Sequence, residues 1–419
     1  MTNKQNIPHG FKPSPRGPIP SDWVLKPLGE LGFFSKGKGI LKEQVIESGL
    51  PCIRYGEIYT THDFIVKEFK SYISEDVAKE SNEIKKGDIL FAGSGETLEE
   101  IGKAVAYIGN EKAYAGGDVI ILSTNEKVNT ECLSYSLEID FVKRQKRRLG
   151  QGHSVVHIYP SDLSTLKIPL PPLPEQRAIA HILGLMDTAI NKNNLLIAKK
   201  ELQKKWLMQN LLTGKKRMKG FGGEWKESKL GDFGKLKMCK RVFNHETGNK
   251  GEIPFYKIGT FGKKADAFIS KELYDEYRTK FSFPQKGEIL ISAAGTLGRT
   301  VVYDGSPGYF QDSNIVWISH NESKVTNEYL FYAYGIISFD SEGGTIQRLY
   351  NNIIKNARLN LPPLEEQTAI AQVLQAADKE IQLLKTKTEK LREQKKGLMQ
   401  VLLTGKKRLT VKAENLQPQ

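Results

Sequence analysis

The chain has 419 residues, with 62 Lys and Arg against 48 Asp and Glu, a formal charge of +14 and a pI near 9.3. This length exceeds a single hydrophobic core, and the basic excess favours nucleic acid as a partner before a membrane, because no long apolar run or basic amphipathic helix occurs. The three cysteines, Cys52, Cys132 and Cys239, are scattered and form no CxxC motif, so we expect reduced thiols in a cytoplasmic protein.

The chain opens with a polar, proline-rich segment and continues into a β-rich one. Residues 1–20 lack the apolar core of a signal peptide, so they are expected to be a flexible arm. From 21 to 165, blocks such as KGDILFA (from Lys86) and GDVIILS (from Gly117) alternate β-branched and aromatic residues between Gly-rich turns. This alternation predicts strands and hairpins of a first globular domain.

Residues 166–218 are predicted to hold one long helix. Pro171, Pro172 and Pro174 precede or flank a Glu-Gln pair and an apolar-periodic run, which is typical of a helix start. The run stops at Leu-Leu-Thr-Gly214, followed by Lys-Lys-Arg, which suits a helix C-cap and the negative end of the helix dipole. About 38 residues lie between, or roughly 57 Å at 1.5 Å per residue. Such a length indicates a coiled coil or a spacer.

The second part of the chain repeats this order. Residues 219–356 are predicted to be a second β-rich domain, in which KGEILIS (from Lys286) resembles KGDILFA and SNIVWIS (from Ser313) resembles GDVIILS. Residues 357–409 are predicted to be a second long helix, and residues 410–419 a disordered tail. The first domain carries the longer turn GSGETLEEIGK where the second has the compact AAGTLGR.

The two helical segments are copies of one another. Pro171–Met218 and Pro362–Leu409 align without a gap, 191 positions apart, and are identical at 25 of 48 positions. A repeat on this scale reports a repeated structural unit, and two copies predict two pseudo-equivalent halves.

Apolar residues in both helices recur at alternating spacings of four and three, which predicts a narrow seam between two long helices. The seam is interrupted by Asn193, Lys200 and Lys204 in the first copy and by Thr388 and Lys395 in the second. The alternative is two ordinary surface helices of separate domains. The predicted seam residues are Ile179, Leu183, Met186, Ile190, Ile197, Leu207 and Leu211, with Ile370, Leu374, Ala377, Ile381, Leu384, Leu391, Leu398 and Leu402.

Motifs for catalysis are missing from the sequence. There is no phosphate-binding loop with Lys-Ser/Thr, and the glycines at 93, 95 and 102 lack the following helix of a dinucleotide site. His153 and His157 have helical metal-ligand spacing, but HSVVHIY is β-rich, so a metal site is not expected. Glu138, Asp140 and Lys143 could form a nuclease-like triplet, although so charged a chain produces such triplets by chance. We interpret the chain as a binder without catalytic residues or a cofactor of its own.

Two variable domains alternate with two similar helices, each opening on Leu-Pro-Pro-Leu-x-Glu-Gln (Leu170–Gln176 and Leu361–Gln367) and closing on Leu-Leu-Thr-Gly-Lys-Lys-Arg. In this the chain resembles the DNA-specificity subunits of type I restriction–modification systems, from about Trp23 to Leu409. The resemblance implies an α+β fold: two β-rich α/β target-recognition domains separated by two long antiparallel helices, a coiled coil with a pseudo-two-fold internal duplication.

The resemblance also implies partners and a division of labour. Each domain is expected to read half of an asymmetric two-part site on double-stranded DNA. Two methyltransferase subunits are expected to dock, and two motor-nuclease subunits complete the restriction complex where that activity is present. S-adenosylmethionine, ATP and Mg²⁺ would belong to those partners. The alternatives are the specificity subunit of another restriction enzyme that cleaves beside its site, and a stand-alone DNA-modifying enzyme.

Lys and Arg side chains in or beside loops are the candidates for DNA contact, because phosphate contacts position a protein and base-edge contacts supply sequence. We expect Lys215–Arg217 and Lys406–Arg408 to serve the helix C-termini or partner docking instead. The DNA candidates are Lys36, Lys38, Arg54, Lys143, Arg144, Lys146, Arg147 and Arg148 in the first domain, and Lys240, Arg241, Lys263, Lys264, Arg299 and Arg348 in the second.

Two predictions follow from length and duplication. The helix pair should act as a ruler, so that four residues inserted between Leu202 and Gln209, roughly 6 Å of helix, lengthen the unspecified gap by one or two base pairs. A half-chain ending near Met218 should self-associate and read a symmetric site.

Overall fold

The computed structural model describes residues 7–152, 154–337, 339 and 349–409. The chain forms two compact units, one made of Met1–Lys192 with Lys387–Gln419 and the other of Asn193–Thr386. Each unit is described by itself. The chain passes between the units twice, each time inside a long helix. No helix within the described ranges is long and apolar enough to cross a membrane.

The two long helices are α6 (Leu173–Leu211) and α10 (Leu364–Leu402), of 39 residues each. The two predicted long helices and their lengths are therefore confirmed, whereas the predicted segments 166–218 and 357–409 extend beyond the helices at both ends. A left-handed glycine lies three residues beyond the end of each helix, Gly214 with φ of 72° and Gly405 with φ of 70°. A side chain would be strained in that conformation, which is why glycine terminates both helices.

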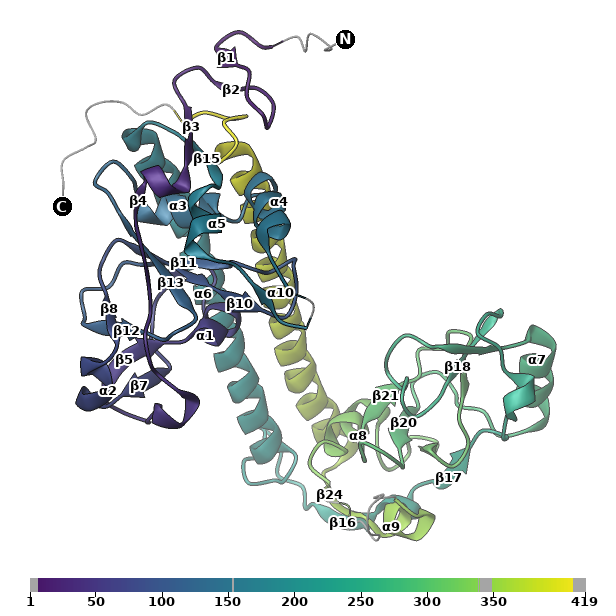
Figure 1. Ribbon diagram of the computed structural model, residues 1–419. Coiled ribbons are helices and arrows are strands. Elements are labelled where there is room, and N and C mark those ends of the chain that lie inside the picture. Colours follow the sequence, from purple (N-terminus) through teal and green to yellow (C-terminus); the bar gives the residue numbers. More distant parts are fainter. Residues whose placement is uncertain (1–6, 153, 338, 340–348, 410–419) are drawn as a thin grey trace. The chain divides into compact units, whose positions relative to one another are not determined.

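The first unit contains a five-stranded sheet in the order β4-β13-β9-β11-β6 and a four-stranded sheet in the order β7-β5-β12-β8 (Figure 1). Strand β9 is buried at all five positions, as its apolar sequence predicts. The strands are β1 (Phe11–Lys12), β2 (Ile19–Pro20), β3 (Val24–Pro27), β4 (Gly32–Lys36), β5 (Leu50–Ile53), β6 (Ile65–Val66), β7 (Ser71–Ile73), β8 (Asn82–Ile84), β9 (Asp88–Ala92), β10 (Ser94–Gly95), β11 (Ala104–Tyr107), β12 (Ala113–Ala115), β13 (Val119–Thr124), β14 (Val156–His157) and β15 (Lys167–Leu170). The shorter helices are α1 (Tyr55–Thr60), α2 (Glu75–Lys79), α3 (Thr130–Ser136), α4 (Asp140–Leu149) and α5 (Pro160–Ser164).

The second unit has the same plan on a smaller scale. A four-stranded sheet has the order β17-β23-β20-β21, a three-stranded sheet has the order β19-β18-β22, and β16 pairs with β24. The strands are β16 (Lys226–Lys229), β17 (Lys235–Met238), β18 (Ile253–Tyr256), β19 (Ala267–Ile269), β20 (Ile289–Ser292), β21 (Thr300–Val302), β22 (Tyr309–Phe310), β23 (Ile315–Ser319) and β24 (Arg358–Leu361). The helices are α7 (Lys271–Lys280), α8 (Asn327–Ala333) and α9 (Asn351–Asn356).

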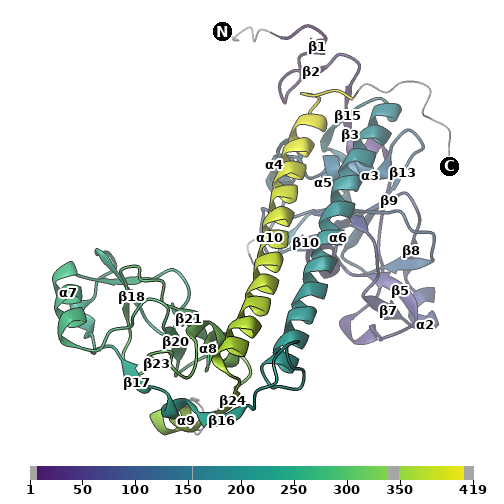
Figure 2. The ribbon, with the colours of Figure 1, turned by 180° about the vertical axis from the view of Figure 1, so that it is seen from behind.

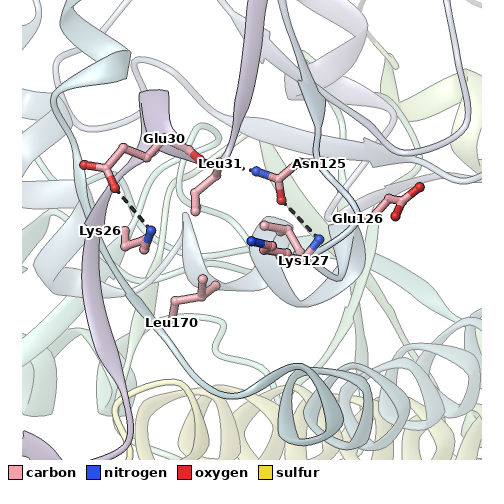
Figure 3. Close-up of a pocket in the computed structure, with 8 residues that line it drawn as sticks. Lys26, Glu30, Leu31, Asn125, Glu126, Lys127 and Leu170 are labelled. Carbon is pink, nitrogen blue, oxygen red and sulfur yellow. Dashed lines mark hydrogen bonds and ion pairs between the residues drawn. The ribbon is translucent and has the colours of Figure 1, made fainter.

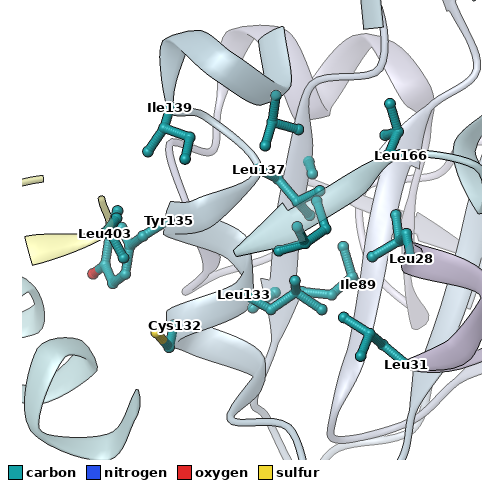
Figure 4. Packing of buried hydrophobic residues seen from close by; sticks show 14 of the residues in the cluster. Leu28, Leu31, Ile89, Cys132, Leu133, Tyr135, Leu137, Ile139, Leu166 and Leu403 are labelled. Atoms are coloured by element: carbon teal, nitrogen blue, oxygen red, sulfur yellow. The ribbon is translucent and has the colours of Figure 1, made fainter. Parts of the chain in front are cut away.

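Each domain is packed on a pair of antiparallel half-helices, as both views of the ribbon show (Figures 1 and 2). In the first unit, Ile179 and Leu183 of α6 share one core with Met399 and Leu402 of α10 and with the domain. Tyr135, Leu133 and Leu403 belong to this cluster (Figure 4). In the second unit the corresponding core contains Leu211 and Ile370. Each domain therefore rests on the start of one helix and the end of the other.

The predicted seam is largely buried. Ile179, Leu183, Ile190, Leu211, Ile370, Leu374, Ile381 and Leu402 are buried, and Met186, Ile197, Leu207, Ala377, Leu384, Leu391 and Leu398 are half-buried. The polar interruptions in the second copy are buried as well, with Thr388 and Lys395 at most 5% exposed. They are parts of the packing surface and not gaps in it.

The expected boundaries differ from the structure at three places. The arm, expected to be flexible, contains the hairpin β1–β2; Ile19 is buried, and Arg16 donates a hydrogen bond to the carbonyl of Thr404 at 3.2 Å. Residues 167–170 were assigned to the helical segment but form β15, which pairs with β3. Residues 358–361 were likewise assigned to the second helical segment, 357–409, but form β24, which pairs with β16. Residues 410–419, predicted to be a disordered tail, lie outside the described residues.

Candidate nucleic-acid interface

The Glu of the repeated Glu-Gln pair is the centre of a buried cluster in the first unit. Glu175 is 4% exposed and accepts hydrogen bonds from Trp23 Nε1 at 2.9 Å and from Arg408 Nε and Nη2 at 2.8 Å each. Arg408 also forms an ion pair with Asp22. These contacts raise the pKa of the Arg408 guanidinium and lower the pKa of Asp22, through its hydrogen bond with Arg408. We call Trp23, Glu175 and Arg408 the first clamp.

The second unit contains the same arrangement, which we call the second clamp. Glu366 is fully buried and accepts hydrogen bonds from Arg217 Nε at 2.8 Å, Arg217 Nη2 at 2.6 Å and Trp225 Nε1 at 3.1 Å. Burial by itself would raise the pKa of Glu366, but the hydrogen bonds from Arg217 and Trp225 outweigh it and the pKa is lowered. The two arginines that we expected to serve the helix C-termini therefore bind the start of the other helix within their unit.

The neighbouring glutamines join each helix start to its domain. Gln176 accepts a hydrogen bond from the backbone N–H of Asn129, the N-cap residue of α3, at 2.8 Å. Gln367 accepts the corresponding bond from Thr326, the N-cap residue of α8, at 2.9 Å. Both side chains also donate to a proline carbonyl at the helix start. The repeated Glu-Gln motif therefore fixes each domain on its helix.

A third repeated contact lies farther along the helices. In the first unit, Lys395 forms an ion pair with Asp187 at 2.6 Å, and Asp187 accepts a hydrogen bond from Tyr135. The ammonium of Lys395 lies 3.7 Å from the ring centroid of Phe64. In the second unit Lys204, Asp378 and Tyr332 repeat this network, with less burial. Lys204 and Lys395 were predicted as interruptions of the seam, and both hold it together.

The candidates on the first domain lie on loops and on α4. Lys36 and Lys38 are exposed, and Lys38 forms a surface ion pair with Glu80 at 3.5 Å. Lys36 lies over the ring of Tyr159. Arg54 is half-buried, and its Nε has no hydrogen-bond partner among the described residues.

Helix α4 separates its basic residues into two groups. Lys146 is 3% exposed and binds the carbonyl of Gly102 and Glu138, both at 2.9 Å, and Lys143 binds Glu138 at 3.0 Å. These two lysines hold α4 to its domain and lower the pKa of Glu138 against the effect of burial. Glu138 thus belongs to a structural ion pair. The exposed side chains of this run are Arg144, Arg147 and Arg148.

In the second domain the candidates lie on three loops. Lys240 and Arg241 follow β17 and are exposed, and Lys263 and Lys264 are exposed in the loop before β19. Arg299 is half-buried and donates to the carbonyl of Phe261 at 3.0 Å. Arg348 lies outside the described residues. These positions are compatible with DNA contact, which stays a prediction.

A polar hollow of about 310 Å³ lies beside Arg241. Its walls are residues 241–244, Thr247, Phe255, Lys257 and the turn 311–314. Arg241 Nε donates to Asp312 Oδ2 at 2.8 Å. The sequence predicted Arg241 but missed Asn244, Gln311 and Asn314, because these amides come from two segments that only the folded sheet brings together. We call this feature the Arg241 hollow.

A larger hollow, of about 530 Å³, lies at the base of the first domain near β15. Lys26, Glu30, Asn125, Lys127 and Leu170 are among its walls (Figure 3). Lys26 and Glu30 form an ion pair at 3.3 Å, and Asn125 accepts a hydrogen bond from the Lys127 backbone. Its polar groups are thus largely paired with one another.

No group of three or more His, Cys, Asp or Glu side chains is arranged to hold a metal ion in the parts of the chain that the structure describes. His157 lies on strand β14, as the β-rich sequence predicts, and its Nδ1 is 3.0 Å from Ser94 Oγ. His153 lies outside the described residues.

The sequence matches the family model of the type I restriction modification DNA specificity domain twice, over residues 20–200 and 222–393. A putative type I restriction enzyme MjaX specificity subunit from Methanocaldococcus jannaschii is 30% identical, and the alignment covers 95% of this chain and 97% of that protein. A putative type I restriction enzyme specificity subunit from Haemophilus influenzae is 40% identical over 63% of this chain and 68% of its own length.

Solved structures agree in fold. A type I restriction-modification S subunit from M. genitalium has a TM-score of 0.57 at 15% identity, with 96% of this chain and 99% of that chain covered. A chain from a study of complex assembly and conformational transition of the type I system has a TM-score of 0.58 at 19% identity, with 92% and 99% covered. Two matches to the family model, two long helices and a relative matched over nearly its whole length agree, and the chain belongs to the family of type I restriction–modification DNA-specificity subunits, with two target-recognition domains.

Proposed function

We propose that each β-rich domain reads one half of a two-part asymmetric DNA site and that the two long helices set the unspecified gap between the halves. The observation that carries this proposal is the duplicated clamp. The two domains are held on their helix pairs by the same contacts, Glu175 with Arg408 and Glu366 with Arg217. The loops of the two domains differ in sequence. The contacts that hold the domains on the helices are therefore repeated, while the loops that would contact DNA are not.

Phosphate contacts would supply affinity, and side chains on the loops would supply sequence. The net charge of +14 supports salt-dependent binding to a polyanion. Among the basic residues, the best candidates are those that are exposed and form no ion pair within the part of the chain that the structure describes, which favours Arg144, Arg147 and Arg148 over Lys143 and Lys146.

The helix pair would also dock the modification subunits. Leu195, Leu202 and Trp206 on α6 are 72%, 69% and 47% exposed. Their spacings of seven and four residues place them within about 40° of one another around the helix. An exposed apolar stripe of this kind marks a protein contact, and we assign it to a methyltransferase subunit. Two such subunits, and two motor-nuclease subunits where restriction occurs, would complete the assembly.

We assign no catalytic step to this chain. Methyl transfer to adenine N6 would take place on the modification subunits, which would bind S-adenosylmethionine. ATP and Mg²⁺ would be used by the motor-nuclease subunits. The isolated chain should therefore bind none of the three.

The test is to co-express the chain with its modification subunit and map N6-methyladenine across the host genome by single-molecule sequencing. We expect one asymmetric motif with two specified parts and a fixed gap. A stable complex without methylation would favour a cleavage-only system, and the absence of any complex would refute the proposed partner.

A further inference from the structure

The two domains differ most informatively at the Arg241 hollow. Strand β23 pairs with β17 so that Ser319 faces Lys235, and β13 pairs with β4 so that Ser123 faces Phe33. The segments GDVIILS and SNIVWIS end on these two serines. Counting six residues on from Lys235 and from Phe33 places Arg241 of the second domain at the position of Gly39 in the first. The same alignment places Asp312 at the position of Gly116.

In the first domain the loop and the turn contact each other through their backbones, and glycines stand at the two aligned positions. Gly117 donates a hydrogen bond to the carbonyl of Gly39 at 3.1 Å. A Cβ on Gly37 would lie 2.0 Å from the carbonyl oxygen of Gly116, so the loop and the turn touch at Gly37, whereas a Cβ on Gly39 or Gly116 would meet its nearest neighbour at 3.5 Å. The second domain has the corresponding loop and a turn that is one residue longer, 311–314 against 116–118. Arg241, Asn244, Asp312 and Asn314 lie around an open hollow there.

Contacts with neighbouring residues fix the position of the Arg241 side chain and of its loop. Its Nε is bound to Asp312, whose carboxylate is largely buried, while the Arg241 side chain is 62% exposed. The loop itself is anchored, because Tyr309 donates to the carbonyl of Lys240 at 3.1 Å. With Nε occupied, Nη1 and Nη2 remain as a planar pair of donors.

The amides beside Arg241 have matching chemistry. Gln311 accepts a hydrogen bond from the backbone of Ile258 at 2.9 Å, which fixes its side chain and leaves its NH₂ group as a donor. Asn244 and Asn314 complete the wall. Arginine pairs bidentately with guanine O6 and N7, and Asn or Gln with adenine, in the major groove.

We infer that Arg241 reads a guanine in the half-site of the second domain and that Asp312 is its positioning residue. This inference rests on the proposed function. Because Gly39 and Gly116 occupy the matching places, the first domain has no counterpart of this contact. The second domain would therefore contact its half-site through a side chain that the first domain lacks at the aligned position.

The test uses the full chain in complex with its modification subunit, in four forms: wild type, Arg241→Ala, Asp312→Asn and Arg358→Ala. Arg358 is the matched control, because it forms a comparable exposed ion pair with Glu227 in the same unit, at 2.9 Å. We expect Arg241→Ala to lose discrimination at one guanine by on the order of 5- to 150-fold, with the other half-site unchanged. Asp312→Asn should give a smaller loss at the same base, and Arg358→Ala none.

A second measurement does not depend on methylation. DNA in which that guanine is replaced by 7-deazaguanine lacks the N7 acceptor. It should bind the wild-type complex several-fold more weakly, and Arg241→Ala should show no further loss, because both changes remove the same contact. Equal losses in both proteins would overturn the inference.

The outcomes separate the two claims. A wild-type complex that neither methylates nor binds a two-part motif would overturn the proposed function and this inference with it. A clear wild-type motif that Arg241→Ala leaves unchanged, or relaxes in both halves, would overturn the inference alone.

Discussion

Arg408, just beyond the end of α10, forms a two-pronged ion pair with Glu175 in the first turn of α6, although 233 residues separate them. Arg217 and Glu366 form the same contact in the second unit, 149 residues apart. In each unit, therefore, an arginine that follows the end of one long helix binds the glutamate in the first turn of the other long helix. The chain is built from two interlocked halves.

Removal of the first clamp should destabilise the first unit. Arg408→Ala leaves the carboxylate of Glu175 buried without its cation, and we expect the free energy of unfolding to fall by about 3 kcal/mol, the low end for a broken buried pair because Arg408 is partly exposed. Urea unfolding measures this loss. Lys406→Ala, an exposed cation two residues away, is the control and should change stability by less than about 0.5 kcal/mol. Equal effects of the two substitutions would contradict the clamp.

The buried lysine of the seam should matter more than its counterpart. Lys395→Met leaves Asp187 without its ion-pair partner in a buried site, and we expect a loss of roughly 3 kcal/mol. Lys204→Met breaks the equivalent pair with Asp378, where both side chains are more exposed. Solvent screening there should limit the loss to about 1 kcal/mol or less. Thermal and urea unfolding of both variants test the difference, and a larger loss for Lys204→Met would refute it.

The free energy of unfolding should fall in mild acid, because the unfolded chain binds a proton at His62 more readily than the folded chain. Burial, aided by the charge of Lys103, lowers the pKa of this imidazole from 6.5 to about 4. The unfolded chain then takes up its proton first as the pH falls, so the stability that His62 contributes is complete above pH 6.5 and is lost between pH 6.5 and about 4. The loss should be about 3 kcal/mol at most. In urea titrations across this range His62→Gln should flatten the slope, while His9→Gln, on the exposed arm, should leave it unchanged.

The ruler idea can be tested with matched insertions. The ion pairs Asp187–Lys395 and Lys204–Asp378 show that facing positions of α6 and α10 pair in a constant antiparallel register. Four residues inserted after Lys205 and four after Ala376 keep the pairs on both sides of the insertion in register. The helices then grow by roughly 6 Å, and the gap should lengthen by one or two base pairs of roughly 3.4 Å. Methylation mapping gives the gap directly, and an unchanged gap would refute the ruler.

A half-chain should dimerise. A chain ending at Met218 retains Trp23, Glu175 and Arg217, so Arg217 of one copy can bind Glu175 of the other as Arg408 does in the full chain. We expect a dimer at micromolar concentration by sedimentation velocity, reading a symmetric site. Arg217→Ala in the half-chain removes the contact with Glu175 of the other copy and should weaken the dimer. A monomer that binds no DNA would show that the halves are not equivalent in this way.

The sequence predicted the frame of the molecule well, because its signals are local. Prolines, the Glu-Gln pair and a terminal glycine mark the ends of α6 and α10, and regular apolar spacing marks the seam. The sequence did not predict the contacts between residues that are far apart along the chain. Nothing near Arg408 indicates that its partner is Glu175, and Lys395 reads as an interruption until Asp187, Phe64 and Tyr135 are seen around it. The hairpin β1–β2 is too short to leave a pattern.

The candidate site was harder to predict for the same reason. Lysines and arginines are recognisable by type, but their partners decide their role. Lys143 and Lys146 belong to an ion pair with Glu138, whereas Arg144 and its neighbours are exposed. The amides of the Arg241 hollow come from segments about 70 residues apart. Comparison of the matching segments of the two domains is the one signal in the sequence that points to them.

The interlocked clamps bear on how such a chain evolves. An ancestral half with one domain and one helix would already have carried both partners of the clamp, so two copies could have assembled before their genes fused. Fusion would have released each domain from having to match its twin, while the clamp contacts stayed alike. Arg241 and Asp312, which align with Gly39 and Gly116 of the first domain, are differences of the kind that such a release permits.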